Sequence, residues 1–502
     1  MSKKQIRIVA LLLALMLVIP MLVSCAGKGG SGNKTETTSG KDDNGSKDDR
    51  EFLDNLPDDL DFNGKTFTIL ARDDNMYANF KHEIIADEDE VELVNQAVYE
   101  RNTKIEDRFG VTINAILTPG SYEEKDDFIN TFKTSIMAGD GAYDLIMGYQ
   151  AYMSQMSLQD LYLNLYEVPN LDFEQSYWYH DIVDELTVDG KLFYAVGDYS
   201  LTFWEYLYVL YFNKTIANNY NVENIYDLVK DGTWTIDKLI ELTKGKYKDL
   251  NGDNWPGSED QFGYISTYQN TLDALFSQFD VQATHRDEEN KIVLDVDQSK
   301  VVSILEKMNG FFATEEVYTV HTSSMTTFDD DPLDKMFRED KALFYPERIE
   351  RAQKFRDMET DFGIVPYPKW NETQKSYPTQ AWNAYSVAVV PMDVQDREFT
   401  GAMLEALTAE SSRTVIPAYN EQALTYKYTR DDESAEMLKL VRENITINFG
   451  YYYYEDLRTG EWFRILISKE DPNNNFVSYY TANRNGYERS LKKIMKSYAE
   501  HE

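Results

Sequence analysis

The chain has 502 residues, enough for one large core or for two or three domains. Its 87 acidic and 50 basic residues give a net charge of −37, a surface that repels nucleic acid and anionic lipid head groups. We therefore expect no nucleic-acid partner. One cysteine leaves no pair for a disulfide bond within the chain, so stability must come from burial.

The N-terminus has the pattern of an export signal. Lys3, Lys4 and Arg7 precede an apolar run of about sixteen residues (8–23), which is short for a membrane span and typical of a secretory signal peptide. The run ends in Leu-Val-Ser before Cys25, and this ending resembles a bacterial lipobox. The resemblance implies cleavage before Cys25 and lipidation of its thiol. An ordinary signal peptide or N-terminal anchor with an incidental cysteine is the alternative.

The segment after the lipobox has almost no apolar residues. Residues 26–50 are mostly Gly, Ser, Thr, Asn, Lys and Asp, which cannot bury enough surface to offset the entropy of ordering. We predict a signal peptide over residues 1–24 and a lipidated cysteine with a flexible tether over residues 25–60.

Predicted strands and helices alternate after the tether. In chain order they are a strand at 66–71, a helix at 91–109 ending at Gly110, a strand at 111–117, a helix from a Ser121–Glu124 capping box to Gly139, and a strand at 143–148. A β-α-β-α-β order predicts a parallel sheet whose ligands lie beyond the carboxyl ends of the strands.

A second α/β region follows residues 191–196. Its predicted elements are strands at 206–213, 342–345, 362–367 and 385–390, a helix that begins at Ile236 with Thr235 as N-cap, and helices at 397–409 and 433–444.

Short segments in this order carry a family resemblance. They are 95–102 (NQAVYERN), 109–111 (FGV), 143–146 (YDLI), 189–196 (DGKLFYAV), 211–214 (YFNK), 232–235 (GTWT) and 362–366 (FGIVP). Together, behind an export signal, they resemble the extracellular solute-binding proteins of ABC importers, in the sugar-binding family related to maltose-binding protein.

The resemblance implies an α/β, two-lobed periplasmic-binding-protein-like fold of type II. Each lobe would be a sheet flanked by helices, with a hinge between the lobes and the ligand in the cleft. By analogy, residues 60–197 and 386–430 form the first lobe, and residues 198–385 and 431–502 form the second.

A sugar site needs aromatic platforms and side chains that satisfy pairs of hydroxyls. The candidate ligand-binding residues, chosen after predicted strands and crossovers, are Arg72, Asp73, Tyr149, Gln150, Trp204, Glu205, Tyr268, Glu347, Arg348, Trp382 and Asn383. Arg72 and Asp73 could instead pair with each other. Glu347 and Arg348 stand where the family often places an aromatic residue, which indicates either a more polar or charged ligand or a salt bridge.

Two other patterns have competing interpretations. The run 451–454 is four tyrosines, either a stacking wall near the cleft or half core and half surface. Asp249, Asn251, Asp253, the Trp255 carbonyl and Asp260 have the spacing of an EF-hand-like calcium loop. Asn254 replaces the usual glycine and Asp260 the usual glutamate, so an Asx-rich turn is the alternative to a structural calcium ion.

These patterns lead to one functional prediction. We expect a monomeric receptor, lipid-anchored at the outer face of the cytoplasmic membrane, that captures an oligosaccharide or related polyol and delivers it to ABC permease subunits. We expect no required cofactor and no catalytic residues, because no GxSxG, HExxH or CxxC pattern is present. The alternatives are a lipid-anchored glycan-active enzyme, and a sensor or receptor of the same fold for a non-sugar solute.

Overall fold

The computed structural model describes residues 52–74, 80–267, 270–320, 331–420, 431–467 and 475–501. The predicted signal peptide, Cys25, most of the tether and Tyr268 lie outside the described residues. No helix in the described ranges is both long enough and apolar enough to cross a membrane.

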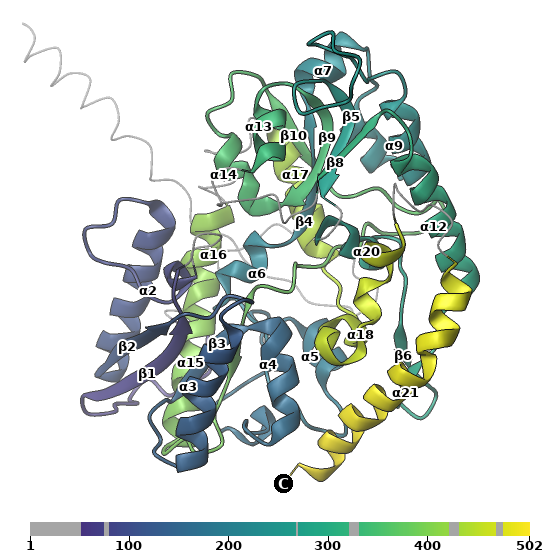
Figure 1. Cartoon of the computed structure of the whole chain (residues 1–502). Coiled ribbons are helices and arrows are strands. Elements are labelled where there is room, and N and C mark those ends of the chain that lie inside the picture. Colours follow the sequence, from purple (N-terminus) through teal and green to yellow (C-terminus); the bar gives the residue numbers. More distant parts are fainter. Residues whose placement is uncertain are drawn as a thin grey trace, which may run out of the picture. The chain divides into compact units, whose positions relative to one another are not determined.

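A four-stranded sheet contains the first three predicted strands (Figure 1). Its order is β11 (Ser386–Val389), β3 (Leu145–Tyr149), β1 (Lys65–Arg72) and β2 (Val111–Thr118). β1 pairs in parallel with both β2 and β3, whereas β11 is antiparallel to β3. The predicted parallel arrangement is confirmed, and it places the carboxyl ends of β1 and β3 side by side.

Helices α2 (Leu93–Phe109), α3 (Lys125–Ala138) and α15 (Arg397–Arg413) belong to this region, and α2 packs against α15 and β2 (Figure 1). α2 ends as predicted at Gly110, whose φ of 59° is left-handed. α3 begins later than the predicted capping box. The Glu124 carboxylate accepts a hydrogen bond from the Ser121 hydroxyl at 2.8 Å, so the pair closes a turn and the helix begins at Lys125.

A five-stranded mixed sheet forms the second α/β region. Its order is β10 (Phe362–Val365), β4 (Tyr208–Asn213), β9 (Ala342–Arg348), β5 (Phe262–Thr267) and β8 (Val317–Val320). Alternate residues of β4 face two different apolar clusters, Leu210 and Phe212 in one and Val209 and Tyr211 in the other. Both faces of this sheet are therefore covered.

Helices surround the second sheet (Figure 1). They include α7 (Lys214–Asn219), α8 (Ile225–Lys230), α9 (Ile236–Thr243), α12 (Gln298–Phe312), α13 (Pro332–Arg338), α14 (Ala352–Phe355) and α17 (Asp432–Glu443). α9 begins as predicted, because the Thr235 side chain accepts a hydrogen bond from the Lys238 amide. A small hairpin joins β6 (Thr284–Arg286) to β7 (Ile292–Leu294).

Short helices and one long C-terminal helix complete the described chain. They are α4 (Gln150–Met156), α5 (His180–Leu186), α6 (Leu201–Glu205), α10 (Asn270–Asp273), α11 (Leu275–Gln278), α16 (Val415–Pro417), α18 (Phe449–Tyr452), α19 (Tyr454–Leu457), α20 (Trp462–Leu466) and α21 (Phe476–Glu500). At its start α21 packs Phe476 on Trp462, and near its end Tyr498 packs on Phe193. The last helix thus contacts segments far apart in the chain, and the division of the chain between lobes stays a prediction.

Candidate functional site

Three connecting segments lie side by side between the two sheets. The segment before β4 pairs with the segment before β11, since the Trp382 amide donates to the Tyr206 carbonyl at 2.9 Å. That second segment also pairs with the one after α17, because the Thr446 amide donates to the Thr379 carbonyl at 2.7 Å. A narrow ribbon of three connecting segments, joined by isolated β-bridges, therefore links the two α/β regions.

Trp382 is the centre of an aromatic and charged cluster on this ribbon. Its ring lies 6.5 Å from Tyr149 at the end of β3 and 5.4 Å from Tyr206 on the neighbouring segment. The guanidinium of Arg348, at the end of β9, lies 4.3 Å from the Trp382 ring centroid. Residues from both sheets therefore meet at this half-buried tryptophan, and its role in binding a ligand stays a prediction.

Arg72 enters the cluster from the four-stranded sheet. Its Nη2 donates to the Ser386 hydroxyl at 2.8 Å, and its guanidinium lies 5.3 Å from the Tyr149 ring of the intervening strand. Burial raises the pKa of the Tyr149 phenol, and the charge of Arg72 opposes that rise. The alternative pairing with Asp73 is wrong: the Asp73 carboxylate accepts from the Asp74 amide instead.

Glu347 and Arg348 lie within β9 and not after it, because the predicted strand 342–345 extends to Arg348. The Arg348 guanidinium is paired on two sides, with Glu347 at 2.9 Å and Glu350 at 3.1 Å. Glu347 also lies 3.6 Å from Arg351. Burial raises the pKa of Glu347, but the two arginines outweigh it and keep the pKa below its usual value. The salt-bridge interpretation of this pair is therefore confirmed. The charge of Arg348 is already neutralised by its carboxylate partners.

Trp204 and Glu205, in α6, have separate partners. The Trp204 indole donates to Asp198 at 3.3 Å, and Glu205 accepts from His82 at 3.1 Å. Burial lowers the pKa of His82, but the Glu205 carboxylate outweighs it and raises that pKa to about 9. At neutral pH this pair is an ion pair with no net charge.

Three further candidate residues remain. The Gln150 side chain donates to the Tyr452 carbonyl at 2.8 Å, so its amide is used in packing α4 against α18. Asn383 is buried beside Trp382, and Tyr268 lies outside the described residues. The four tyrosines at 451–454 are all buried, so the predicted surface half of that run is wrong.

Sequence reasoning missed a set of buried phenols, of which Tyr208 lies close to Arg348. The hydroxyls of Tyr208, Tyr367 and Tyr451 have no hydrogen-bond partner within the described part of the chain. Burial raises the pKa of Tyr208 well above its ordinary value; Tyr451 raises it further, and Arg348 lowers it. The tyrosine run pointed to Tyr451, but no sequence signal separates an unpartnered phenol from a partnered one.

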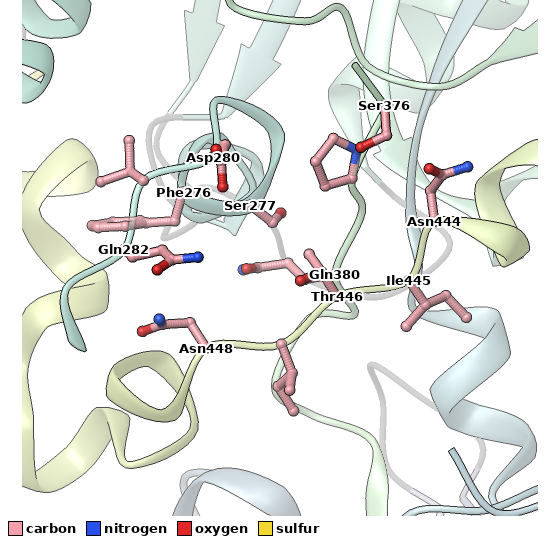
Figure 2. Close-up of a pocket in the computed structure, with 13 residues that line it drawn as sticks. Phe276, Ser277, Asp280, Gln282, Ser376, Gln380, Asn444, Ile445, Thr446 and Asn448 are labelled. Carbon is pink, nitrogen blue, oxygen red and sulfur yellow. The ribbon is translucent and has the colours of Figure 1, made fainter. Parts of the chain in front are cut away.

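A polar cavity of about 290 Å³ lies on the α11 side of the ribbon (Figure 2). Its lining includes Ser277, Asp280, Gln282, Gln380, Asn444 and Asn448. The amides of Gln380, Asn444 and Asn448 already donate to backbone carbonyls, those of Asp273, Leu440 and Thr284. None of the predicted ligand-binding residues lines it. Buried donors without a hydrogen-bond partner among the described residues include Arg72 and Tyr208, near Trp382, and also Gln278 in α11. Because the Trp382 cluster joins residues of both sheets, we take it as the candidate binding site.

The predicted calcium loop has the hydrogen bonds of an Asx-rich turn. Asp249 accepts from the amides of Gly252 and Asn254, and Asp253 accepts from the Trp255 amide. Asn254 has a left-handed φ of 62°, which is the backbone that the sixth position of such a loop requires. In the described ranges no three His, Cys, Asp or Glu side chains are grouped to hold a metal, and calcium stays a prediction.

Comparisons with known proteins bear on this geometry. Residues 103–411 match the family model for bacterial extracellular solute-binding proteins. No curated protein sequence matches the chain.

Solved structures share the fold at low sequence identity. The galacto-N-biose/lacto-N-biose I-binding protein of an ABC transporter from Bifidobacterium longum is 12% identical with a TM-score of 0.55, over 86% of this chain and 98% of that one. The GacH receptor of Streptomyces glaucescens is 11% identical with a TM-score of 0.52, over 87% and 97%. An ABC substrate-binding protein from Listeria monocytogenes, solved with cycloalternan, is 13% identical with a TM-score of 0.50, over 87% and 99%.

These likenesses establish the fold as the two-lobed α/β fold of the sugar-binding proteins. The family match covers more than half of the 502 residues and includes β2, β3 and the whole five-stranded sheet. The chain therefore belongs to the family of bacterial extracellular solute-binding proteins.

Proposed function

We propose that this protein captures a carbohydrate, an oligosaccharide or a related polyol, between its two lobes and delivers it chemically unchanged to an ABC permease. Family membership supports solute binding. Structures with the same fold were solved with lacto-N-biose, acarbose, cycloalternan and maltotetraose, which supports a saccharide as the solute.

The observation that carries the proposal is the Trp382 cluster. The Trp382 indole contacts Tyr149, whose ring lies beside the Arg72 guanidinium, and Arg348, whose charge acts on the buried Tyr208 phenol. Apolar sugar faces stack on aromatic rings, and sugar hydroxyls accept from and donate to such groups. A bound saccharide would give these buried polar atoms the partners they lack.

Entry of a ligand requires the lobes to separate. Trp382 contacts Tyr149 of one sheet and Arg348 of the other, so the described state is packed at this point. The ribbon of three connecting segments is narrow and lies between the sheets, which is where a hinge would bend. We propose that opening about this ribbon admits the solute and that binding stabilises closure.

The proposal extends to the location of the protein. The lipobox-like end of the apolar run supports attachment of Cys25 to lipid, with residues 25–60 as the tether. A receptor held at the outer face of the cytoplasmic membrane can meet the permease without crossing the bilayer itself.

The test is a thermal-shift screen of the full-length protein against neutral and acidic oligosaccharides, followed by small-angle scattering with each hit. A ligand should raise the melting temperature by mass action and reduce the radius of gyration. Trp382→Ala should lose the response, while Trp255→Ala, whose side chain is 77% exposed on the 249–260 loop, should keep it. No shift with any saccharide, or a shift that survives Trp382→Ala unchanged, would refute the site.

A further inference from the structure

Arg72 is a buried cation with unused hydrogen-bond donors. Its side chain is 1% exposed, and its Nε and Nη1 atoms have no partner among the described residues. A guanidinium carries five N–H groups, and the Ser386 hydroxyl accepts from only one nitrogen, Nη2. The remaining contacts are ring faces, Phe80 at 3.7 Å and Tyr149 at 5.3 Å.

No described carboxylate forms an ion pair with Arg72. The nearest one in its hydrogen-bond network, Glu83, is reached through Ser386 and Thr202, and its Oε2 already accepts from the Thr202 amide and hydroxyl at 2.9 Å each. Arg348, across Trp382, is instead paired with two carboxylates. Leaving a buried charge without a direct counter-ion is costly, so its retention needs an explanation.

The position of Arg72 in the sheet explains why a buried charge is retained there. It is the last residue of β1, at the carboxyl end of a parallel strand, where ligands of such sheets bind. Its guanidinium lies over Tyr149, and the Tyr149 ring contacts Trp382 edge-on. The unused donors therefore belong to the candidate binding site.

We propose that the solute carries a carboxylate, so that it is an oligosaccharide containing a uronic acid, and that Arg72 binds this carboxylate. This inference rests on the proposed function. A planar carboxylate matches the donor geometry of a guanidinium and supplies the missing negative charge. The neighbouring cations, Arg348 and His82, are paired with carboxylates, whereas Arg72 has no carboxylate partner among the described residues, and a single guanidinium matches a single carboxylate.

The decisive comparison uses the full-length protein without mutation. Calorimetry is run with trimers of galacturonate, mannuronate and glucuronate, each beside its methyl ester, which has nearly the same shape but no charge. At least one acid should bind ten to one hundred times more tightly than its ester. If no acid in the panel exceeds its ester, the inference is overturned.

Failure of the inference and failure of the proposed function give different results. If neutral or esterified sugars bind and the acid is not preferred, the proposed function stands and the proposal of a carboxylate on the solute fails. If no saccharide binds, the proposed function itself is refuted. A sulfated disaccharide that binds while every uronate fails would also overturn the inference, because the ligand anion would then be a sulfate ester.

Variants provide an independent check. Arg72→Met removes the buried charge but keeps most of the side-chain volume, so it should abolish the preference for the acid without lowering the melting temperature of the ligand-free protein. Arg72→Lys keeps the charge and should retain part of the preference. Arg489→Gln, exposed on α21, is the matched control and should bind as the wild type does. A preference for the acid that persists in Arg72→Met would contradict the assignment.

Discussion

Glu405 makes the stability of this protein depend on pH in a way that can be measured. The side chain, in α15, is 1% exposed. It accepts hydrogen bonds from the Tyr177 hydroxyl at 2.5 Å, the Trp178 indole at 3.0 Å and the Asp172 amide at 3.2 Å. Burial raises the pKa of this carboxyl from 4.5 to about 7, although the three hydrogen bonds oppose the rise.

The direction of the effect follows from proton linkage. Between pH 4.5 and 7 the folded protein keeps a proton on Glu405 that the unfolded chain has released, so the free energy of unfolding falls as pH rises. The contribution is fully present below the unfolded pKa and is lost as pH rises through the folded one. At about 1.4 kcal/mol per pKa unit, it amounts to about 3 kcal/mol, of which about 2 kcal/mol is lost between pH 5.5 and 8.5.

The assay is urea unfolding of the wild type, Glu405→Gln and the control Glu100→Gln at pH 5.5, 7.0 and 8.5. Glutamine cannot ionise, so the stability of Glu405→Gln relative to wild type should rise by about 2 kcal/mol between the lowest and highest pH. Glu100 is exposed on α2, and its variant should follow the wild type at every pH. A constant difference between Glu405→Gln and wild type across the pH range would refute the reasoning.

Four further predictions concern the site, the loop, an ion pair and the anchor. Trp382→Ala should weaken saccharide binding more than tenfold and, because its ring packs on Tyr149 and Tyr206, lower the ligand-free melting temperature as well; unchanged calorimetric affinity would remove it from the site. A calcium chelator should lower the melting temperature of the wild type but not of a variant with Asp249→Ala, whereas no shift in the wild type would leave the loop as Asx turns. The pKa of about 9 at His82 predicts a stabilising contribution that is present below pH 6.5 and lost as pH rises through 9; thermal melts should show a shallower decline in His82→Gln, and identical pH profiles would contradict this. Cys25→Ser should move the protein from the membrane fraction to the medium, and unchanged fractionation would exclude a lipid anchor at this residue.

The local sequence pattern was enough to predict three strands of the four-stranded sheet. The runs at 66–71, 111–117 and 143–148 form β1, β2 and β3 within two residues of the predicted limits. β3 is buried throughout and β1 over its second half, whereas β2, at the sheet edge, is mostly exposed or half-buried. Apolar runs mark β1 and β3, and glycines with left-handed φ end the helices between the strands, so each signal is contained in a few adjacent residues. The strands β5 and β8 were not predicted. β5 ends in Ser266 and Thr267, whose burial depends on neighbouring strands that lie far away in the chain.

The sequence predicted only part of the candidate site. Topology places Arg72, Tyr149 and Trp382 near the carboxyl ends of strands or on a crossover, and the structure brings these three together. It assigns Gln150 and Trp204 to internal packing, because their polar atoms find partners on other segments. Residue type and place along the chain predict proximity to a cleft, but not whether a side chain is already satisfied.

The sequence by itself determined the alternation of strands and helices and the family resemblance, and it predicts an export signal, because each depends on residues close together in the chain. Tertiary structure alone decided which charges remain unpaired. Arg348 meets its neutralising carboxylates within two residues, whereas among the described residues Arg72 donates only to the Ser386 hydroxyl, 314 residues away. Electrostatic balance in a buried site is set by contacts between distant segments, and here it distinguishes a structural arginine from one with donors left for a ligand.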